Sequence, residues 1–225
     1  MIIILKKEAA EKGFADSLVT MTGNITKDED CEAAVKLCVD TFGTCNVLSH
    51  NAGVIDDFTP AERITNESWD KVMAVNLTGT MKVCRAALQY FVPNEIKASL
   101  VLITSNAAFE SATGGPAYCA SKAGANAFMK AVAYEYGSKG IRCNSICPGP
   151  IASNIQESAP MDKWDKEGMA MHHGRGYNAA QQAWTGYQYV FPNAIAPLAV
   201  YLASDESFFM NSNSCVIDGG VCLSR

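Results

Sequence analysis

The chain has 225 residues, of which 48% are hydrophobic and 18% charged, and its formal net charge is −5 at pH 7. Because an acidic chain without a basic stripe lacks the charge that binds a phosphate backbone, no nucleic acid partner is expected. The N-terminal apolar run, residues 2–5, is too short for a secretion signal or a membrane span, which predicts a cytoplasmic protein with no membrane partner.

Short apolar runs alternate with longer helical stretches along the chain, and this order is typical of an α/β fold with a parallel sheet. No linker or internal repeat divides the sequence, so one domain is expected over residues 1–225. The predicted elements are strands at 2–5, 17–21, 46–49, 100–103 and 141–146, and helices at 6–14, 68–91, 117–137 and 193–206.

Tyr118 and Lys122 are four residues apart in the predicted helix 117–137, and this spacing places their side chains next to each other. A phenol can donate a proton, and a nearby ammonium group is expected to lower its pKa toward the neutral range. The alternative is an exposed aromatic side chain beside a solvated lysine.

Polar or glycine-containing turns follow three of the predicted strands. Ser105 follows the strand at 100–103, HNAG follows the strand at 46–49, and PGP follows the strand at 141–146. Ligands of open α/β sheets bind at the carboxyl ends of the strands. We therefore expect a ligand site at this edge of the sheet.

The nine cysteines are an odd number and form no CxxC pair. This pattern indicates neither a disulfide framework nor a zinc site, and no metal ligand is predicted.

With these motifs the chain resembles the short-chain dehydrogenase/reductase family from about residue 22 to residue 218. The resemblance implies a Rossmann-like, doubly wound and mostly parallel sheet with helices on both faces. It also implies a catalytic set of Asn76, Ser105, Tyr118 and Lys122. In that family the serine polarises a substrate carbonyl, the tyrosine gives the proton, and the asparagine holds a water that links the lysine to solvent. The alternative for Asn76 is a helix asparagine that satisfies a neighbouring carbonyl.

The same resemblance implies an NAD(P)(H) cofactor and a homodimer or homotetramer formed through the helices at 68–91 and 117–137. HNAG at 50–53 is similar to the family's NNAG turn, PGPI at 148–151 to its nicotinamide loop, and IDGG at 217–220 to its closing turn. The residues expected to bind the cofactor are Asn24, Ile25, Asn51, Ala52, Gly53, Lys122, Pro148, Gly149, Ile151 and Ser153.

The chain departs from the family pattern because no GxxxGxG sequence occurs in it. That loop normally binds the pyrophosphate through its backbone N–H groups and the following helix. The first βα unit of the fold is therefore expected to be missing or rebuilt. Either the strand at 2–5 occupies the vacant central position, or a partner chain covers the gap, or the protein is marginally stable; we favour the first.

The segment at about 151–193 is expected to be a lid over the substrate, since long irregular loops are often functional. It is rich in Met and aromatic side chains, which favours a bulky apolar or ring-bearing small molecule. Alternatively, these side chains only pack the lid against the body. The residues expected to contact substrate are Ser105, Asn106, Tyr118, Trp164 and Trp184.

Three functions remain open from the sequence. The first is an oxidoreductase that interconverts a carbonyl and an alcohol, with Tyr118 as acid and base. The second is a cofactor-independent enzyme that uses Ser105, Tyr118 and Lys122 for isomerisation, elimination or cyclisation. The third is an inactive truncated remnant. We favour the first, because the NAG turn, the PGPI loop and Lys122 all have uses in nicotinamide binding.

Overall fold

The computed structural model describes residues 2–110, 113–159, 161–173, 190–220 and 222, with side chains from residue 6 onward. Four parallel strands form one sheet in these residues, in the spatial order β1-β2-β3-β4. Leu48 pairs with Leu100, Leu100 with Cys143, and Ile146 with Cys215. The strands are β1 (Val47–His50), β2 (Ala98–Ile103), β3 (Ile141–Pro148) and β4 (Ser214–Ile217).

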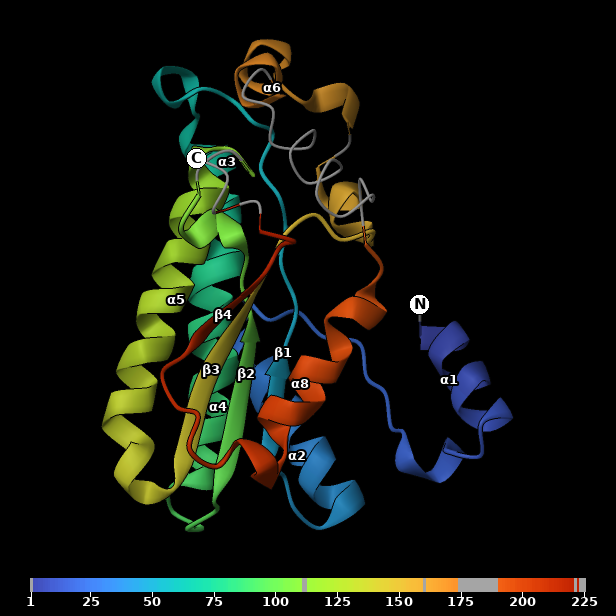
Figure 1. The fold of residues 1–225 in the computed structure, drawn as a ribbon. Coiled ribbons are helices and arrows are strands. Elements are labelled where there is room, and N and C mark those ends of the chain that lie inside the picture. The colour runs from blue at the N-terminus through green and yellow to red at the C-terminus, as the bar shows by residue number, and fades with distance from the viewer. Residues whose placement is uncertain (1, 111–112, 160, 174–189, 221, 223–225) are drawn as a thin grey trace.

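Helices cover both faces of this sheet (Figure 1). On one face lie α4 (Thr80–Phe91) and α5 (Pro116–Tyr136), with α2 (Asp28–Phe42) packed against α4. On the other face lies α8 (Ala196–Ala203). The short helices α3 (Asn66–Met73) and α6 (Lys166–His173) lie near the carboxyl ends of the strands. The predicted α/β class, with a mostly parallel sheet between two helical layers, is confirmed.

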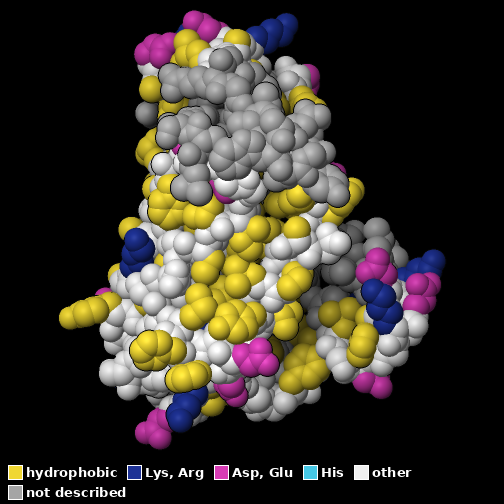
Figure 2. Space-filling view, in the orientation of Figure 1, with side chains coloured by type: hydrophobic (Ala, Val, Ile, Leu, Met, Phe, Trp, Pro, Cys, Tyr) yellow, Lys and Arg dark blue, Asp and Glu magenta, His cyan; other side chains and the backbone are white. Residues whose placement is uncertain are grey.

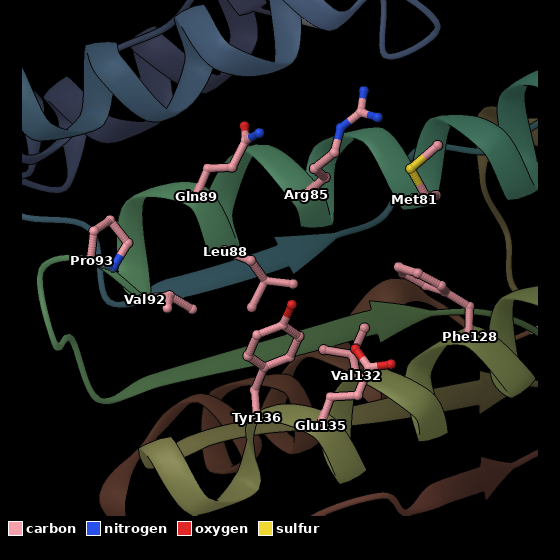
Figure 3. Close-up of a pocket in the computed structure, with 10 residues that line it drawn as sticks. All are labelled: Met81, Arg85, Leu88, Gln89, Val92, Pro93, Phe128, Val132, Glu135 and Tyr136. Atoms are coloured by element: carbon pink, nitrogen blue, oxygen red, sulfur yellow. The ribbon is translucent and has the colours of Figure 1, made fainter.

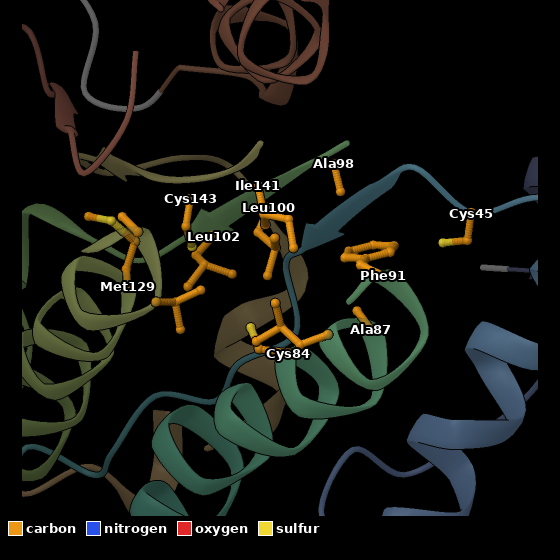
Figure 4. Close-up of a cluster of buried hydrophobic side chains, with 13 residues drawn as sticks. Cys45, Cys84, Ala87, Phe91, Ala98, Leu100, Leu102, Met129, Ile141 and Cys143 are labelled. Carbon is orange, nitrogen blue, oxygen red and sulfur yellow. The ribbon is translucent and has the colours of Figure 1, made fainter. Parts of the chain in front are cut away.

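Strand β2 is apolar on both sides because both of its faces are covered, as expected for a central parallel strand. Leu100 and Leu102 point toward α4 and α5, where they meet Phe91 and Met129 (Figure 4). Val101 points the other way and packs in a second cluster with α8. These two layers fix β2 and β3, whose carboxyl ends position the candidate site.

The strand predicted at 2–5 is wrong, because these residues begin helix α1 (Ile2–Glu11), which stands apart from the sheet in Figure 1. The run is followed by KKEAAEK, which consists of strong helix formers. A helix satisfies its backbone groups locally, whereas a strand needs a neighbour to pair with. Residues 18–21, the greater part of the second predicted strand, likewise form neither a strand nor a helix.

The vacant position beside β1 is therefore not filled by residues 2–5, contrary to the sequence-based expectation. Within the described residues, β1 pairs only with β2 and forms an edge of the sheet. Val47 on this strand is 41% exposed. A covering partner chain and marginal stability, the other two possibilities, stay predictions. In the described part of the chain no helix is long and apolar enough to cross a membrane.

Candidate active site

Helix α5 places Tyr118 in its first turn and Lys122 one turn later. Both side chains are buried, with 6% of Tyr118 and 5% of Lys122 exposed. The Lys122 Nζ atom lies 5.5 Å from the centroid of the Tyr118 ring and donates to the Ile103 carbonyl at 3.4 Å. The structure thus confirms that Tyr118 and Lys122 are close together. The alternative, an exposed tyrosine beside a solvated lysine, is wrong.

Ser105 follows β2, and its hydroxyl lies close enough to the Tyr118 phenol to act on the pKa of that group. The Oγ atom also accepts from the Ala107 N–H at 3.1 Å, which caps a short 3₁₀ helix at Asn106–Ala108. This cap fixes the serine side chain at the end of the strand. Two hydroxyl groups, those of Ser105 and Tyr118, are therefore brought together beside Lys122.

Burial dominates the protonation of the pair. Loss of water raises the pKa of Tyr118 to about 12, although the hydrogen bond from Ser105 acts to lower it. Burial also lowers the pKa of Lys122 to about 8. The expectation that Lys122 brings the phenol toward a neutral pKa is therefore wrong, because desolvation is the largest effect on the phenol and raises its pKa.

Asn76 lies in a π-helical segment, Ala74–Gly79, between α3 and α4. Its Oδ1 accepts from the Val54 N–H at 2.8 Å, and its Nδ2 donates to the Val54 carbonyl at 2.8 Å and to the Ser121 hydroxyl at 3.0 Å. Asn76 thus clamps the chain after β1 against α5. These bonds fit the structural alternative, and the water relay stays a prediction.

The turn after β1 lies directly against the lysine. A Cβ at Gly53 would come within 3.2 Å of the Lys122 Nζ and 3.3 Å of the Asn76 Oδ1, so a side chain there would press on both. Asn51 and Ala52 are exposed beside it. The NAG turn and Lys122, two of the predicted cofactor contacts, are therefore neighbours.

The other predicted cofactor residues fall in two places. Asn24 and Ile25 lie between α2 and the π-helical segment, and the Asn24 Oδ1 is already engaged by the Thr26 N–H at 3.0 Å and hydroxyl at 2.9 Å. Beyond β3, Gly149 packs against Asp218, where a Cβ would be 2.8 Å from the Asp218 Cβ. This group consists of Pro148, which is buried, Gly149 and Ile151, which are half-buried, and Ser153, which is exposed.

The segment predicted as a lid leaves the body at Ile151 and returns at Val190, where an isolated parallel bridge joins the two residues. Its first half lies over the loop after β1: Asp165 accepts from Arg63 at 3.1 Å and donates its N–H to the Asp57 carbonyl at 2.8 Å. Residues 174–189, with Trp184, lie outside the described part.

An apolar cluster lies beside the tyrosine. The Trp164 ring contacts Phe58 at 4.9 Å between centroids, and its Nε1 donates to the Ala159 carbonyl at 2.7 Å. Of the predicted substrate contacts, Asn106 is buried and donates to Asp218 at 3.3 Å. We call this group the tyrosine-side cluster; it consists of Ile55, Phe58, Ala107, Tyr118 and Ala159, with Cys119, Ile155, Trp164 and Met169 at its border.

Asp56 is a part of this region that the sequence reasoning missed. Its buried carboxylate accepts the N–H groups of Gly115 and Tyr118, both at 2.9 Å. The Gly-Gly pair before Pro116 was the available signal, since adjacent glycines at a helix start indicate close approach of another group. Within the described residues no group of three or more His, Cys, Asp or Glu side chains is arranged to hold a metal ion.

A parallel sheet covered by helices, with a buried serine, tyrosine and lysine at the carboxyl ends of its strands, defines an enzyme of the Rossmann-like class. A family model described as Enoyl-(Acyl carrier protein) reductase matches residues 5–222. The chain belongs to the short-chain dehydrogenase/reductase family.

Individual relatives agree with this assignment. The chain is 34% identical to the 3beta-hydroxysteroid dehydrogenase 2 of Eggerthella lenta, over 96% of this chain and 79% of that relative. A crystal structure of a short chain dehydrogenase from Bacillus anthracis superposes with a TM-score of 0.72 at 27% identity, covering 90% of this chain and 75% of the other. A structure of ribose-5-phosphate isomerase from Brucella melitensis gives a TM-score of 0.76 at 26% identity, covering 96% and 79%.

Proposed function

We propose that this enzyme interconverts a carbonyl and an alcohol on a bulky apolar or ring-bearing small molecule, with Tyr118 as the acid and base. The observation that carries the proposal is that Ser105, Tyr118 and Lys122 are buried together, with the Lys122 Nζ 5.5 Å from the centroid of the Tyr118 ring and Ser105 near enough to act on the pKa of the phenol. The neighbouring tyrosine-side cluster is apolar, and its border residues Ile155, Trp164 and Met169 are only partly buried. The similarity to a relative named for a hydroxysteroid supports a ring-bearing substrate.

In the direction of reduction, Ser105 would donate a hydrogen bond to the substrate oxygen, and Tyr118 would give its proton as that oxygen gains negative charge. A phenol with a pKa of about 12 is fully protonated at neutral pH and ready to donate. Lys122, whose pKa of about 8 leaves it mostly charged at neutral pH, stabilises the tyrosinate that forms. In oxidation the same proton returns to Tyr118.

The chain's residues fit the nicotinamide end of NAD(P)(H), which when bound supplies or accepts a hydride at the substrate carbon. Lys122 and the NAG turn are neighbours, and Gly53 is free of the Cβ that would crowd them. Lys122 and Asn51 would hold the ribose, and Gly149, Ile151 and Ser153 would lie beside the nicotinamide. The sequence contains no GxxxGxG loop for the pyrophosphate.

That missing motif favours a second candidate, redox-neutral chemistry with the same Ser105, Tyr118 and Lys122. A hydroxyl and a phenol can polarise a carbonyl and shuttle a proton without any nucleotide. The similarity to a solved structure titled as an isomerase supports this candidate.

We also propose that the enzyme is a homo-oligomer that associates through α4 and α5. A groove of about 460 Å³ runs between these helices and is open to solvent (Figure 3). Leu88, Val92 and Phe128 contribute apolar side chains to its walls. A second apolar face, around α8, carries exposed Val200 and Phe208, and Figure 2 shows hydrophobic side chains gathered there. The α4–α5 face is preferred because both helices are long.

The decisive experiment is a calorimetric titration of the protein and of a Tyr118→Phe variant with NADH and NADPH, followed by turnover of a 3-ketosteroid. We expect saturable binding by both proteins and at least about 100-fold slower turnover by the variant, because only the proton donor is lost. Absence of nucleotide binding by the folded protein would overturn the redox proposal. Tyr118-dependent exchange of the ketone's α-hydrogen with deuterated water would then support the second candidate.

A further inference from the structure

One buried carboxylate from the loop between β1 and α3, that of Asp56, lies at the start of α5, the helix that carries Tyr118. Asp56 is 3% exposed and accepts the N–H groups of Gly115 and Tyr118, both at 2.9 Å. It also accepts the Phe58 N–H at 3.4 Å. Gly115 and Tyr118 lie 59 and 62 positions after Asp56 in the chain. Their hydrogen bonds to Asp56 therefore join two separate elements.

The first turn of any α-helix leaves N–H groups without partners inside the helix, and an N-cap side chain usually binds one of them. Here the N-cap residue is Gly115, which has no side chain to do this. Tyr118 is the third residue of the helix, so its N–H is one of the unpaired groups. Asp56 binds the N–H of the N-cap and of the third residue, the two groups that a capping box satisfies from within the helix.

The glycines before α5 make room for this contact. A Cβ on Gly115 would collide with the Asp56 carboxylate, and a Cβ on Gly114 would collide with the Tyr118 ring. Phe58, which follows Asp56 at a φ of 59°, packs in the same cluster as the Tyr118 ring. The loop therefore contacts the tyrosine at both its backbone and its side chain.

We propose that Asp56 is the positioning residue for Tyr118: it anchors the first turn of α5 and so sets where the phenol meets the substrate oxygen. This inference rests on the proposed function. A misplacement of about 1 Å at a reacting group can cost roughly 100-fold in rate, so a loosened first turn would be visible in turnover.

The test compares Asp56→Asn with Asp57→Asn, which removes the same charge one position along the loop. Asp57 accepts from the Thr59 N–H at 3.2 Å and the Ser68 hydroxyl at 3.2 Å, and so serves the loop rather than α5. An asparagine at 56 turns an amide N–H₂ toward a backbone donor, and one of the two anchoring bonds is lost. Gly115→Ala displaces the carboxylate without altering it and is a second variant if the first folds poorly.

The readouts are amide hydrogen exchange along α5 and the turnover of the 3-ketosteroid with NADH. For Asp56→Asn and Gly115→Ala we expect exchange at Gly115 and Tyr118 to rise at least about tenfold while residues 126–136 keep wild-type rates. We expect kcat to fall about 10- to 100-fold with KM changed less than about threefold. Asp57→Asn should behave as the wild type in both.

Two results would overturn the inference. One is unchanged exchange at Gly115 and Tyr118 in Asp56→Asn; the other is a uniform rise along the whole helix, which would mean that Asp56 supports stability alone. If the wild type turns over no ketone, the proposed function fails, and the local exchange pattern still decides whether Asp56 anchors Tyr118.

Discussion

Burial disfavours the charged forms of three ionisable side chains around the candidate site. The pKa of Tyr118 is raised to about 12, that of Lys122 is lowered to about 8, and that of His50 is lowered to about 4, in each case mainly by loss of water. His50, the last residue of the edge strand β1, is hydrogen-bonded through its Nε2 to the Thr80 hydroxyl at 2.9 Å. At neutral pH Tyr118 and His50 are therefore uncharged while Lys122 stays mostly charged, and the two uncharged groups add no electrostatic cost of burying a charge.

His50 should make the protein sensitive to acid. Its pKa is lowered from 6.5 to about 4 on folding, so between these values the unfolded chain binds a proton that the folded chain does not. Stability is therefore fully present above pH 6.5 and is lost as the pH falls toward 4, by roughly 3 kcal/mol.

The variant His50→Asn, which restores the NNAG sequence of the resembled turn, should lose that acid sensitivity. Urea unfolding of wild type and variant, measured from neutral pH down toward pH 4, gives the difference between them. We expect the two free energies of unfolding to converge or cross as the pH falls. Parallel curves over this range would contradict a buried neutral His50.

For single residues, the sequence predicted the site well where the neighbours in space are also close together along the chain. Tyr118 and Lys122 were paired by helical spacing, and Ser105 was placed by the strand before it. Asp56 could not be found in this way, because acids are common in loops and its partners on α5 are 59 and 62 residues away. Nor did spacing reveal that burial would set the pKa of Tyr118. The catalytic and binding roles themselves stay predictions.

Among the elements, the helix predicted over 68–91 is interrupted by the π-helical segment Ala74–Gly79. Such insertions are uncommon and are often found at functional sites. Here the segment carries Asn76, whose side chain binds both backbone groups of Val54. The irregular turn is thus the point at which the helix holds the chain after β1.

Asn76→Ala should destabilise the protein by about 3 kcal/mol, because three hydrogen bonds are lost and the half-buried Val54 groups are left without these partners. Asn66→Ala, exposed at the start of α3, is the control and should cost less than about 0.5 kcal/mol. Urea unfolding measures both. A cost at Asn76 no larger than at Asn66 would contradict the clamp, and lost turnover without lost stability would favour the water relay.

Sequence patterns located the central strands well and the N-terminal elements badly. The strands at 100–103 and 141–146 lie within β2 and β3, and the first of these runs is entirely apolar, as is typical of a strand buried on both faces. Residues 2–5 are equally apolar, yet they form a helix, because the next residues, KKEAAEK, favour helix. Composition alone cannot show whether a pairing strand is available.

At the scale of the whole molecule, we expect one of the two apolar faces outside the core to be the place where copies associate. Ala123, Ala127 and Ala131 are exposed on α5, the helix whose Phe128 and Val132 line the groove of Figure 3, and small side chains allow close approach of another helix. If α4 and α5 form the interface, Ala127→Glu should convert the oligomer to a monomer because it would bury an unpaired charge.

Sedimentation velocity of wild type, Ala127→Glu and Lys12→Glu tests this expectation. Lys12 is exposed just after α1, away from α4 and α5, and its variant should sediment as the wild type does. If Val200→Glu on α8 dissociates the oligomer and Ala127→Glu does not, the interface lies on the other apolar face. A monomeric wild type would contradict both.

The strand order has a consequence for how the chain folds during its synthesis. Every strand in the described sheet lies next to the strand that precedes it in the chain. As the N-terminal part leaves the ribosome first, β2 can join β1, and β3 can join β2, before β4 exists. The β3–β4 pairing, in which Ser145 meets Ser214, spans the longest stretch of chain and must come last. Non-local parallel pairing is slow, so we infer that closure of β4 limits the folding rate.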